Sequence, residues 1–107
     1  MEVINKKLWK KWRILINRVL ENNNLKVTIS DAGAELISVW DKSRNAERIW
    51  RGDSAVWGRH APILFPFVGK VAGGKYSYRG REYKMTSHGF ARDRQFELVS
   101  EDGESVT

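Results

Sequence analysis

The sequence predicts an all-β fold. From Ile14 onward, short segments in which apolar and polar residues alternate are separated by turns rich in asparagine, aspartate and glycine, which is the pattern of half-buried strands. The chain has 107 residues, 41% of them hydrophobic, and includes five tryptophans. This length suits one small domain or a part of a larger one, and the apolar content is too high for a disordered chain.

The first half of this region contains three expected strands. We expect them over residues 14–20, 25–29 and 34–40, because each stretch is rich in apolar residues, which alternate with polar ones at Leu25, Val27 and Ile29. Residues 21–24 form the first turn, since asparagine tolerates left-handed backbone, and residues 31–33 break the second strand. These elements support an all-β fold.

The middle of the chain is more irregular. Residues 41–47 are polar and predict a turn, residues 48–50 predict a short strand, and a loop opens at Gly52 and extends to Pro62. This stretch therefore predicts a connection with one short strand.

The last third predicts a hairpin over residues 75–85, with Arg79, Gly80 and Arg81 at its turn. A further strand is expected over residues 96–99, followed by a turn at Asp102 and Gly103 and a return strand that begins at 104–107. A chain that stops as a hairpin arm begins would leave an unpaired sheet edge. We therefore expect an incomplete β fold.

The positive charge is concentrated in the first twenty residues. The net charge is +6, and residues 1–20 contain six basic residues against one acidic residue, which leaves the rest of the chain nearly neutral. A nucleic-acid-binding domain would carry its positive face on the folded body, so we expect no nucleic-acid partner. We divide the chain into a basic leader, residues 1–13, and a β domain, residues 14–107.

Three interpretations of the leader remain open. It is a solvated segment that runs into the first strand, a surface-seeking helix with its apolar stripe at Leu8, Trp12, Leu15 and Val19, or a segment that precedes a natural start near Ile14. No run of about eighteen apolar residues predicts a membrane-spanning helix. The absence of cysteine excludes a disulfide framework and fits a reducing compartment, so we expect a cytoplasmic location.

Two segments differ from ordinary strands and turns. In residues 57–70, two prolines bracket an apolar run that has Arg59 before it and Lys70 after it. In residues 87–93, His88 precedes a glycine, which lets the backbone approach a ligand closely, and Arg92 supplies a fork of donors. From the residues alone, a structural role for either segment is at least as well supported as a functional one.

Other chemistry is poorly supported. The two histidines have no metal-ligand spacing, the glycines between residues 69 and 74 lack the pattern of a phosphate-binding loop, and no serine lies in a G-x-S-x-G motif. We therefore expect no metal and no cofactor. The tryptophans suit a hydrophobic core or the wall of a sugar pocket better than a nucleic-acid platform.

Taken in order, these segments resemble the aldose 1-epimerase (galactose mutarotase-like) family, in particular its bacterial aldose-epimerase-like branch. The resemblance extends over about residues 14–107 and omits the leader. It is carried by residues 24–29, 33–36 and 49–50, by Trp57, by residues 61–66 and 68–70, by Gly80 and Tyr83, and by residues 88–92.

The resemblance implies an antiparallel β-sandwich, the galactose mutarotase-like supersandwich, that interconverts the α and β anomers of a hexose. In this family a base takes the proton of the C1 hydroxyl, the ring opens, and an acid protonates the ring oxygen. His88 matches the family's catalytic, sugar-binding histidine. Lys70 stands where an arginine is usual, Arg92 matches a signature arginine, and Arg59 is a further candidate for sugar binding.

The resemblance also implies that this chain lacks part of the catalytic machinery. The family's second histidine and its glutamate base lie beyond Thr107, so the isolated chain is expected to be inactive. Two alternatives remain open: an epimerase of phosphorylated hexoses, for which Arg59, Lys70 and Arg92 would bind phosphate, and a non-catalytic carbohydrate-binding module. In each case the expected partner is a small sugar.

Overall fold

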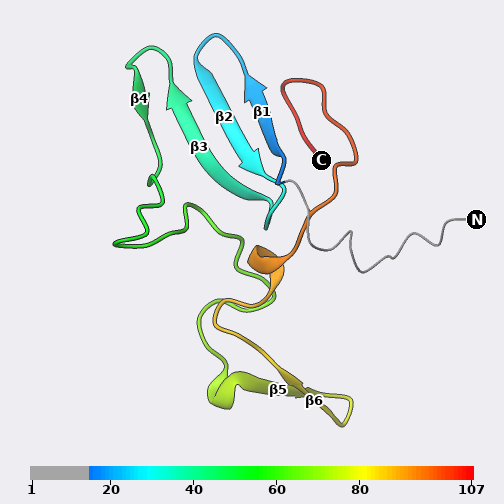
Figure 1. Ribbon diagram of the computed structural model, residues 1–107. Coiled ribbons are helices and arrows are strands. Elements are labelled where there is room, and N and C mark those ends of the chain that lie inside the picture. The colour runs from blue at the N-terminus through cyan, green and yellow to red at the C-terminus, as the bar shows by residue number, and fades with distance from the viewer. Residues whose placement is uncertain (1–14) are drawn as a thin grey trace, which may run out of the picture.

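A four-stranded antiparallel sheet forms the larger part of the protein (Figure 1). The computed structural model describes residues 15–107, so the expectations for the leader lie outside the described residues. The strands are β1 (Asn17–Glu21), β2 (Leu25–Ser30), β3 (Glu35–Asp41) and β4 (Ala46–Glu47), and they lie in the order β1-β2-β3-β4. The first three confirm the strands that the sequence predicts in this region, and they pair antiparallel in chain order.

Short turns with local hydrogen bonds join these strands. Asn22 Oδ1 accepts the backbone N–H groups of Asn24 and Leu25, each at 2.9 Å, which stabilises the turn between β1 and β2. Gly33 and Ala34 adopt positive φ angles of 71° and 47° between β2 and β3. The turns expected at residues 21–24 and 31–33 are therefore confirmed.

The short strand lies earlier than the sequence predicts. The prediction of a strand over residues 48–50 is wrong, because β4 consists of Ala46 and Glu47. The Glu47 carboxylate explains the difference, because its Oε1 accepts the backbone N–H groups of Val39, Arg48 and Ile49 at 2.7, 3.0 and 3.3 Å. The side chain thus takes the N–H groups of Val39 and Ile49, whereas the N–H of Arg48 also donates to Val39 O at 2.9 Å and keeps one backbone bond of the ladder.

The predicted hairpin is confirmed as β5 (Lys75–Tyr78) and β6 (Arg81–Lys84). The turn contains only Arg79 and Gly80, whose φ angles of 48° and 73° are both positive, as a type I′ hairpin turn requires. Arg81 belongs to the strand and not to the turn. Tyr76 and Tyr83 stack across the ladder with ring centroids 5.3 Å apart, which adds a cross-strand contact.

The C-terminal arm is a looser hairpin than expected. Residues 96–99 form no strand, which corrects the prediction, and the arm pairs through the isolated bridges Ala32–Gln95 and Glu101–Val106. Asp102 Oδ1 accepts the N–H groups of Glu104 and Ser105 at 3.0 and 2.7 Å. The expected turn at residues 102–103 is present, but its side-chain hydrogen bonds replace regular strand pairing.

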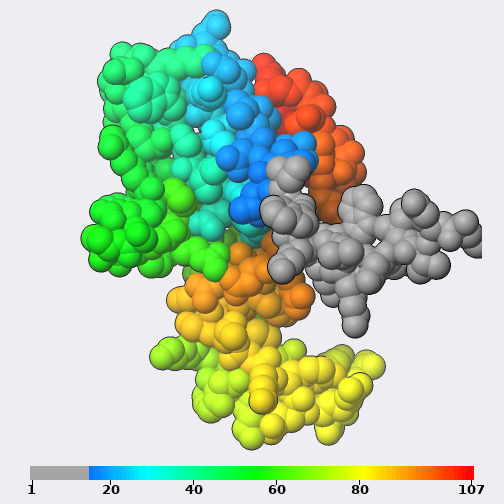
Figure 2. Space-filling view, viewed as in Figure 1, coloured from blue at the N-terminus to red at the C-terminus, as the bar shows by residue number. Residues whose placement is uncertain are grey.

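Few apolar side chains are buried in this architecture. Within residues 15–107 only Met85 and Ala91 are buried apolar residues, while the polar residues Ser30, Glu35 and Asp41 are also buried. Figure 2 shows the β5–β6 hairpin as a lobe apart from the sheet, with the segment around residue 90 between them. Two 3₁₀ turns, η2 (Ala72–Gly74) and η3 (Ala91–Asp93), flank this hairpin along the chain. The described residues include no helix with the length and hydrophobicity of a membrane span.

Candidate functional site

A cavity of about 490 Å³ lies between the segment that precedes the β5–β6 hairpin and the loop that follows it. Its volume is within the range of small-molecule sites. Two other hollows, of about 360 and 270 Å³, border β1, β2 and the C-terminal arm, and neither has a histidine in its lining. The larger cavity is lined by Trp57, His60, Ala61, Pro62, Leu64, Ser87, His88 and Arg92.

The loop after the hairpin is held tightly against the earlier segment. Phe65 O accepts the backbone N–H groups of Phe90 and Ala91 at 2.9 and 3.2 Å. Gly89, with φ 77°, makes this approach possible, because a Cβ atom there would lie 2.0 Å from Phe65 O. The His-Gly pair expected to allow close backbone approach does so, but toward another part of the same chain.

One ring nitrogen of His88 is used by the protein itself. The N–H of Gly69 donates to His88 Nδ1 at 3.0 Å, and the N–H of His88 donates back to Gly69 O at 2.8 Å. Because Nδ1 accepts, we assign the proton of the neutral ring to Nε2. His88 lines the cavity with an Nε2–H donor that has no hydrogen-bond partner within residues 15–107, and Lys70, next to Gly69 in the chain, is exposed and outside the lining.

Arg92 forms another charged part of the cavity wall. Its Nη2 donates to the carbonyl oxygen of Ser87 at 2.8 Å. Its Nε is buried, has no hydrogen-bond partner within residues 15–107, and lies 3.9 Å from the nearest carboxylate oxygen of Asp93. A buried donor without an acceptor is costly, and because this atom is closed to solvent it is not itself a contact for a ligand.

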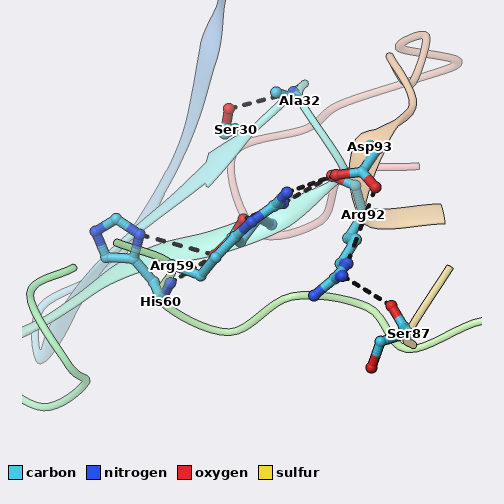
Figure 3. A network of polar contacts seen from close by, with 8 residues as sticks. Ser30, Ala32, Arg59, His60, Ser87, Arg92 and Asp93 are labelled. Carbon is cyan, nitrogen blue, oxygen red and sulfur yellow. Dashed lines mark hydrogen bonds and ion pairs between the residues drawn. The ribbon is translucent and has the colours of Figure 1, made fainter. Parts of the chain in front are cut away.

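Arg59 lies outside the cavity lining, as Lys70 does, and its side chain is used by other parts of the protein. Figure 3 shows its guanidinium directed at the η3 turn, where Nη1 donates to Arg92 O at 3.0 Å and Nη2 to Asp93 Oδ1 at 2.5 Å. Its Nη1 also lies 3.6 Å from Glu35 Oε2. The structure thus brings His88 and Arg92 to one cavity, while Arg59 ties β3 to the η3 turn and is not among the lining residues.

Sequence reasoning missed two polar or aromatic lining residues, Trp57 and His60. Both lie in residues 57–70, the segment that was singled out for its two prolines. Nothing in the sequence shows that this segment faces residues 87–92. The indole Nε1 of Trp50 donates to Trp57 O at 2.7 Å, which fixes the start of the segment. Among residues 15–107 no three histidine, aspartate or glutamate side chains cluster as a metal site.

An antiparallel β scaffold with this cavity places the chain in the class of galactose mutarotase-like β proteins. It superposes with a TM-score of 0.82 on a galactose mutarotase related enzyme from Lactobacillus acidophilus, which is 43% identical, over 85% of this chain and 30% of that one. A galactose mutarotase-like protein from Lactobacillus casei gives a TM-score of 0.81 at 41% identity, over 85% of this chain and 31% of the other. The expected fold class is therefore confirmed.

Residues 18–107 match the family described as aldose 1-epimerase, and the chain belongs to that family. The plasmid-encoded protein LacX of Lactococcus lactis subsp. lactis is 34% identical over 93 residues, which cover 82% of this chain and 31% of LacX. The chain therefore spans about a third of the length of these relatives and corresponds to their N-terminal part.

Proposed function

We propose that this chain supplies sugar-binding residues of an aldose 1-epimerase-type isomerase that interconverts the α and β anomers of a hexose. The observation that carries the proposal is the free Nε2–H of His88 in a cavity that also holds Arg92. An aromatic wall with a few polar donors suits a sugar, whose carbons are apolar and whose hydroxyls need partners. Family membership makes this the leading chemistry.

In this proposal His88 polarises the sugar at its ring oxygen. A neutral imidazole donates a hydrogen bond from Nε2 and retains its proton, so it stabilises charge that develops on the ring oxygen as the C1–O bond breaks. Removal of the C1 hydroxyl proton and protonation of the ring oxygen require a separate base and acid. We propose that those two groups are not in this chain and that the isolated chain does not catalyse mutarotation.

Arg92 and Lys70 bind the hydroxyl groups in this proposal. The Arg92 side chain is part of the cavity wall, and Lys70 is an exposed residue next in the chain to Gly69, which donates to His88. Arg59 supports them indirectly, because its hydrogen bonds hold the backbone of Arg92 and the side chain of Asp93.

The test is a titration of the 107-residue chain with D-galactose and D-glucose, followed by tryptophan fluorescence, since Trp57 lines the cavity. We expect saturable binding that His88→Ala weakens roughly tenfold, because a lost hydrogen bond costs about 1–1.5 kcal/mol. Lys84→Ala, on the exposed face of β6, is the control and leaves binding unchanged. Absence of saturable binding to either hexose contradicts the proposal.

Polarimetry tests the catalytic part separately. We expect α-D-galactose to equilibrate in the presence of the chain at the rate of buffer alone. A chimera that joins residues 15–107 to the remaining part of the Lactobacillus acidophilus relative supplies the missing length. Activity of the chimera that depends on His88 supports the epimerase, while sugar binding without activity favours the alternative of a non-catalytic carbohydrate-binding module.

A specific observation favours phosphorylated hexoses as a second candidate substrate class. Arg92 lines the cavity and Lys70 is exposed, so both side chains offer positive charge to an anion, and guanidinium groups bind phosphate strongly. Titration with D-galactose 6-phosphate beside D-galactose distinguishes the two. Tighter binding of the phosphate, weakened by Arg92→Gln, supports this class, and equal affinities exclude it.

A further inference from the structure

His60 is the second imidazole of the cavity, and it comes from a different segment than His88. His60 lies in the connection between β4 and η2, whereas His88 follows β6, and both line the same cavity. The side chain of His60 is 25% exposed, so it is accessible to a small molecule and also held by the protein. The mechanism proposed above gives this residue no role.

The buried carboxylate of Glu35 holds His60 from one side. Glu35 is the first residue of β3, and its side chain is only 8% exposed. Its Oε1 accepts the backbone N–H of His60 at 2.6 Å, and the same oxygen lies 3.8 Å from His60 Nδ1. Because a buried carboxylate without partners is strongly unfavourable, Glu35 restricts where His60 can lie.

Gly52 packs against the ring of His60. Its φ angle is +72°, and a Cβ atom at this position would lie 2.6 Å from both Cε1 and Nε2 of His60. The imidazole therefore packs directly on glycine backbone. The carboxylate holds the backbone of His60 and the Gly52 backbone packs on its ring, so the residue is partly ordered before a ligand arrives, which lowers the entropic cost of binding.

We propose that His60 is a second sugar contact that selects for one particular hydroxyl group, and that Glu35 is the residue that positions it. The inference rests on the proposed function, because it assigns a specificity role within the same cavity. An imidazole is both a donor and an acceptor, so it can pair with a sugar hydroxyl, which also does both. His60 then binds the hexose from one segment while His88 and Arg92 bind it from the other.

The chain contains only two histidines, which makes NMR a direct test. The two Cε1–H signals are assigned with His60→Ala and His88→Ala, and the 107-residue chain is titrated with D-galactose. We expect both signals to shift along saturable curves with the same midpoint. If only the His88 signal shifts, the His60 proposal is wrong and the proposed function stands. If neither shifts and fluorescence shows no binding, the proposed function itself fails.

A set of deoxy sugars tests selectivity. D-galactose is compared with its 2-, 3-, 4- and 6-deoxy analogues on the wild-type chain and on His60→Ala. We expect His60→Ala to weaken galactose binding roughly tenfold and to have no effect on the one analogue that lacks the contacted hydroxyl. Equal weakening for every sugar indicates a merely structural residue and overturns the proposal.

The role of Glu35 is tested by two substitutions. Glu35→Gln keeps an oxygen that can accept the His60 N–H, whereas Glu35→Ala removes it. We expect Glu35→Gln to retain the pattern of deoxy-sugar affinities and Glu35→Ala to lose it, with Glu97→Ala at an exposed position as the control. If Glu35→Ala does not fold, Glu35→Gln alone decides the matter. Glu35→Gln keeps the oxygen that accepts the His60 N–H, so a changed pattern of deoxy-sugar affinities in this variant would contradict the proposal that Glu35 positions His60 through that hydrogen bond.

Discussion

At the scale of single residues, the site depends on glycines whose lack of a side chain lets two segments meet. Gly89 and Gly80 both have positive φ angles, 77° and 73°, so alanine is strained at either position by about 1–2 kcal/mol. Only Gly89 also faces a neighbour, since a Cβ atom there would lie 2.0 Å from Phe65 O, whereas nothing lies within 4 Å at Gly80. Substitution of Gly80 therefore measures the cost of backbone strain alone, whereas substitution of Gly89 measures backbone strain together with a steric clash.

We expect Gly89→Ala to lower the free energy of unfolding by about 2–5 kcal/mol, because overpacking adds to the strain. It should also weaken sugar binding, since His88 is the preceding residue. Gly80→Ala should lower the free energy of unfolding by only about 1–2 kcal/mol and leave binding unchanged. Urea denaturation and the fluorescence titration measure both effects. Equal destabilisation by the two substitutions would show that the contact with Phe65 is not tight.

The same scale shows which site residues a sequence can reveal. His88 and Arg92 lie four residues apart in one loop, so a local pattern is enough to predict that they share a cavity. Arg59 contacts Glu35 and Asp93, which lie 24 residues before it and 34 residues after it. Its flanking position suggested a ligand contact, because the sequence carries no sign of the long-range carboxylates that use its charge.

At the scale of elements, Asp41, the last residue of β3, stabilises the connection to β4 through hydrogen bonds of its carboxylate. Its Oδ1 accepts the Ser43 hydroxyl at 2.7 Å and the Arg44 N–H at 3.1 Å, and its Oδ2 accepts Arg48 Nη2 at 2.6 Å. The hydrogen bonds from the side chains of Arg48 and Ser43 hold the pKa of Asp41 well below its usual range, against the opposing effect of burial. The carboxylate is therefore ionised in the folded protein at all ordinary pH values.

This lowered pKa predicts how stability depends on pH. An aspartate titrates near 3.9 when unfolded, so the ionised form of Asp41 stabilises the fold fully above that pH and progressively less below it. We expect Asp41→Asn to be less stable than the wild type at pH 7, with a gap that narrows as the pH falls below about 4. Urea denaturation at pH 7, 5 and 3 measures the gap, with Glu97→Gln at an exposed position as the control. A gap that is constant from pH 7 to 3 would contradict this role.

Elements differ in how well local sequence determines them. The β5–β6 hairpin was predictable because Arg79 and Gly80 provide the turn and Tyr76 and Tyr83 pair across it. The strand expected at residues 48–50 was wrong because Glu47 caps the N–H groups next to it. In a sequence, a glutamate that accepts backbone N–H groups cannot be told from one that faces water. The competition between the Glu47 side chain and strand pairing is therefore visible only in the structure.

At the scale of the whole molecule, the described residues expose an unusual amount of apolar surface. Single exposed apolar residues are ordinary, but soluble monomers rarely expose large contiguous apolar patches. Here only Met85 and Ala91 are buried apolar residues among residues 15–107. The large apolar side chains that are at least 57% exposed are Leu15, Val56, Phe65, Val68, Tyr78 and Val99.

We expect the 107-residue chain to associate with itself, because contact between copies removes this apolar surface from water. Its sedimentation coefficient should rise with concentration, and it should bind a hydrophobic dye such as ANS. The double substitution Val68→Lys with Val99→Lys acts at side chains that are 78% and 79% exposed, and it should lower both signals without unfolding the chain.

The control for this experiment separates apolar area from charge. Ser77→Lys with Ser100→Lys adds the same two positive charges at exposed polar positions, starting from the same net charge of +6. If association is hydrophobic, this control lowers it less than the valine pair does, and the difference persists at high salt, where repulsion between surface charges is screened. Equal effects of the two pairs would show that charge alone governs association. A constant sedimentation coefficient without dye binding would show that the exposed side chains find partners within the chain in solution.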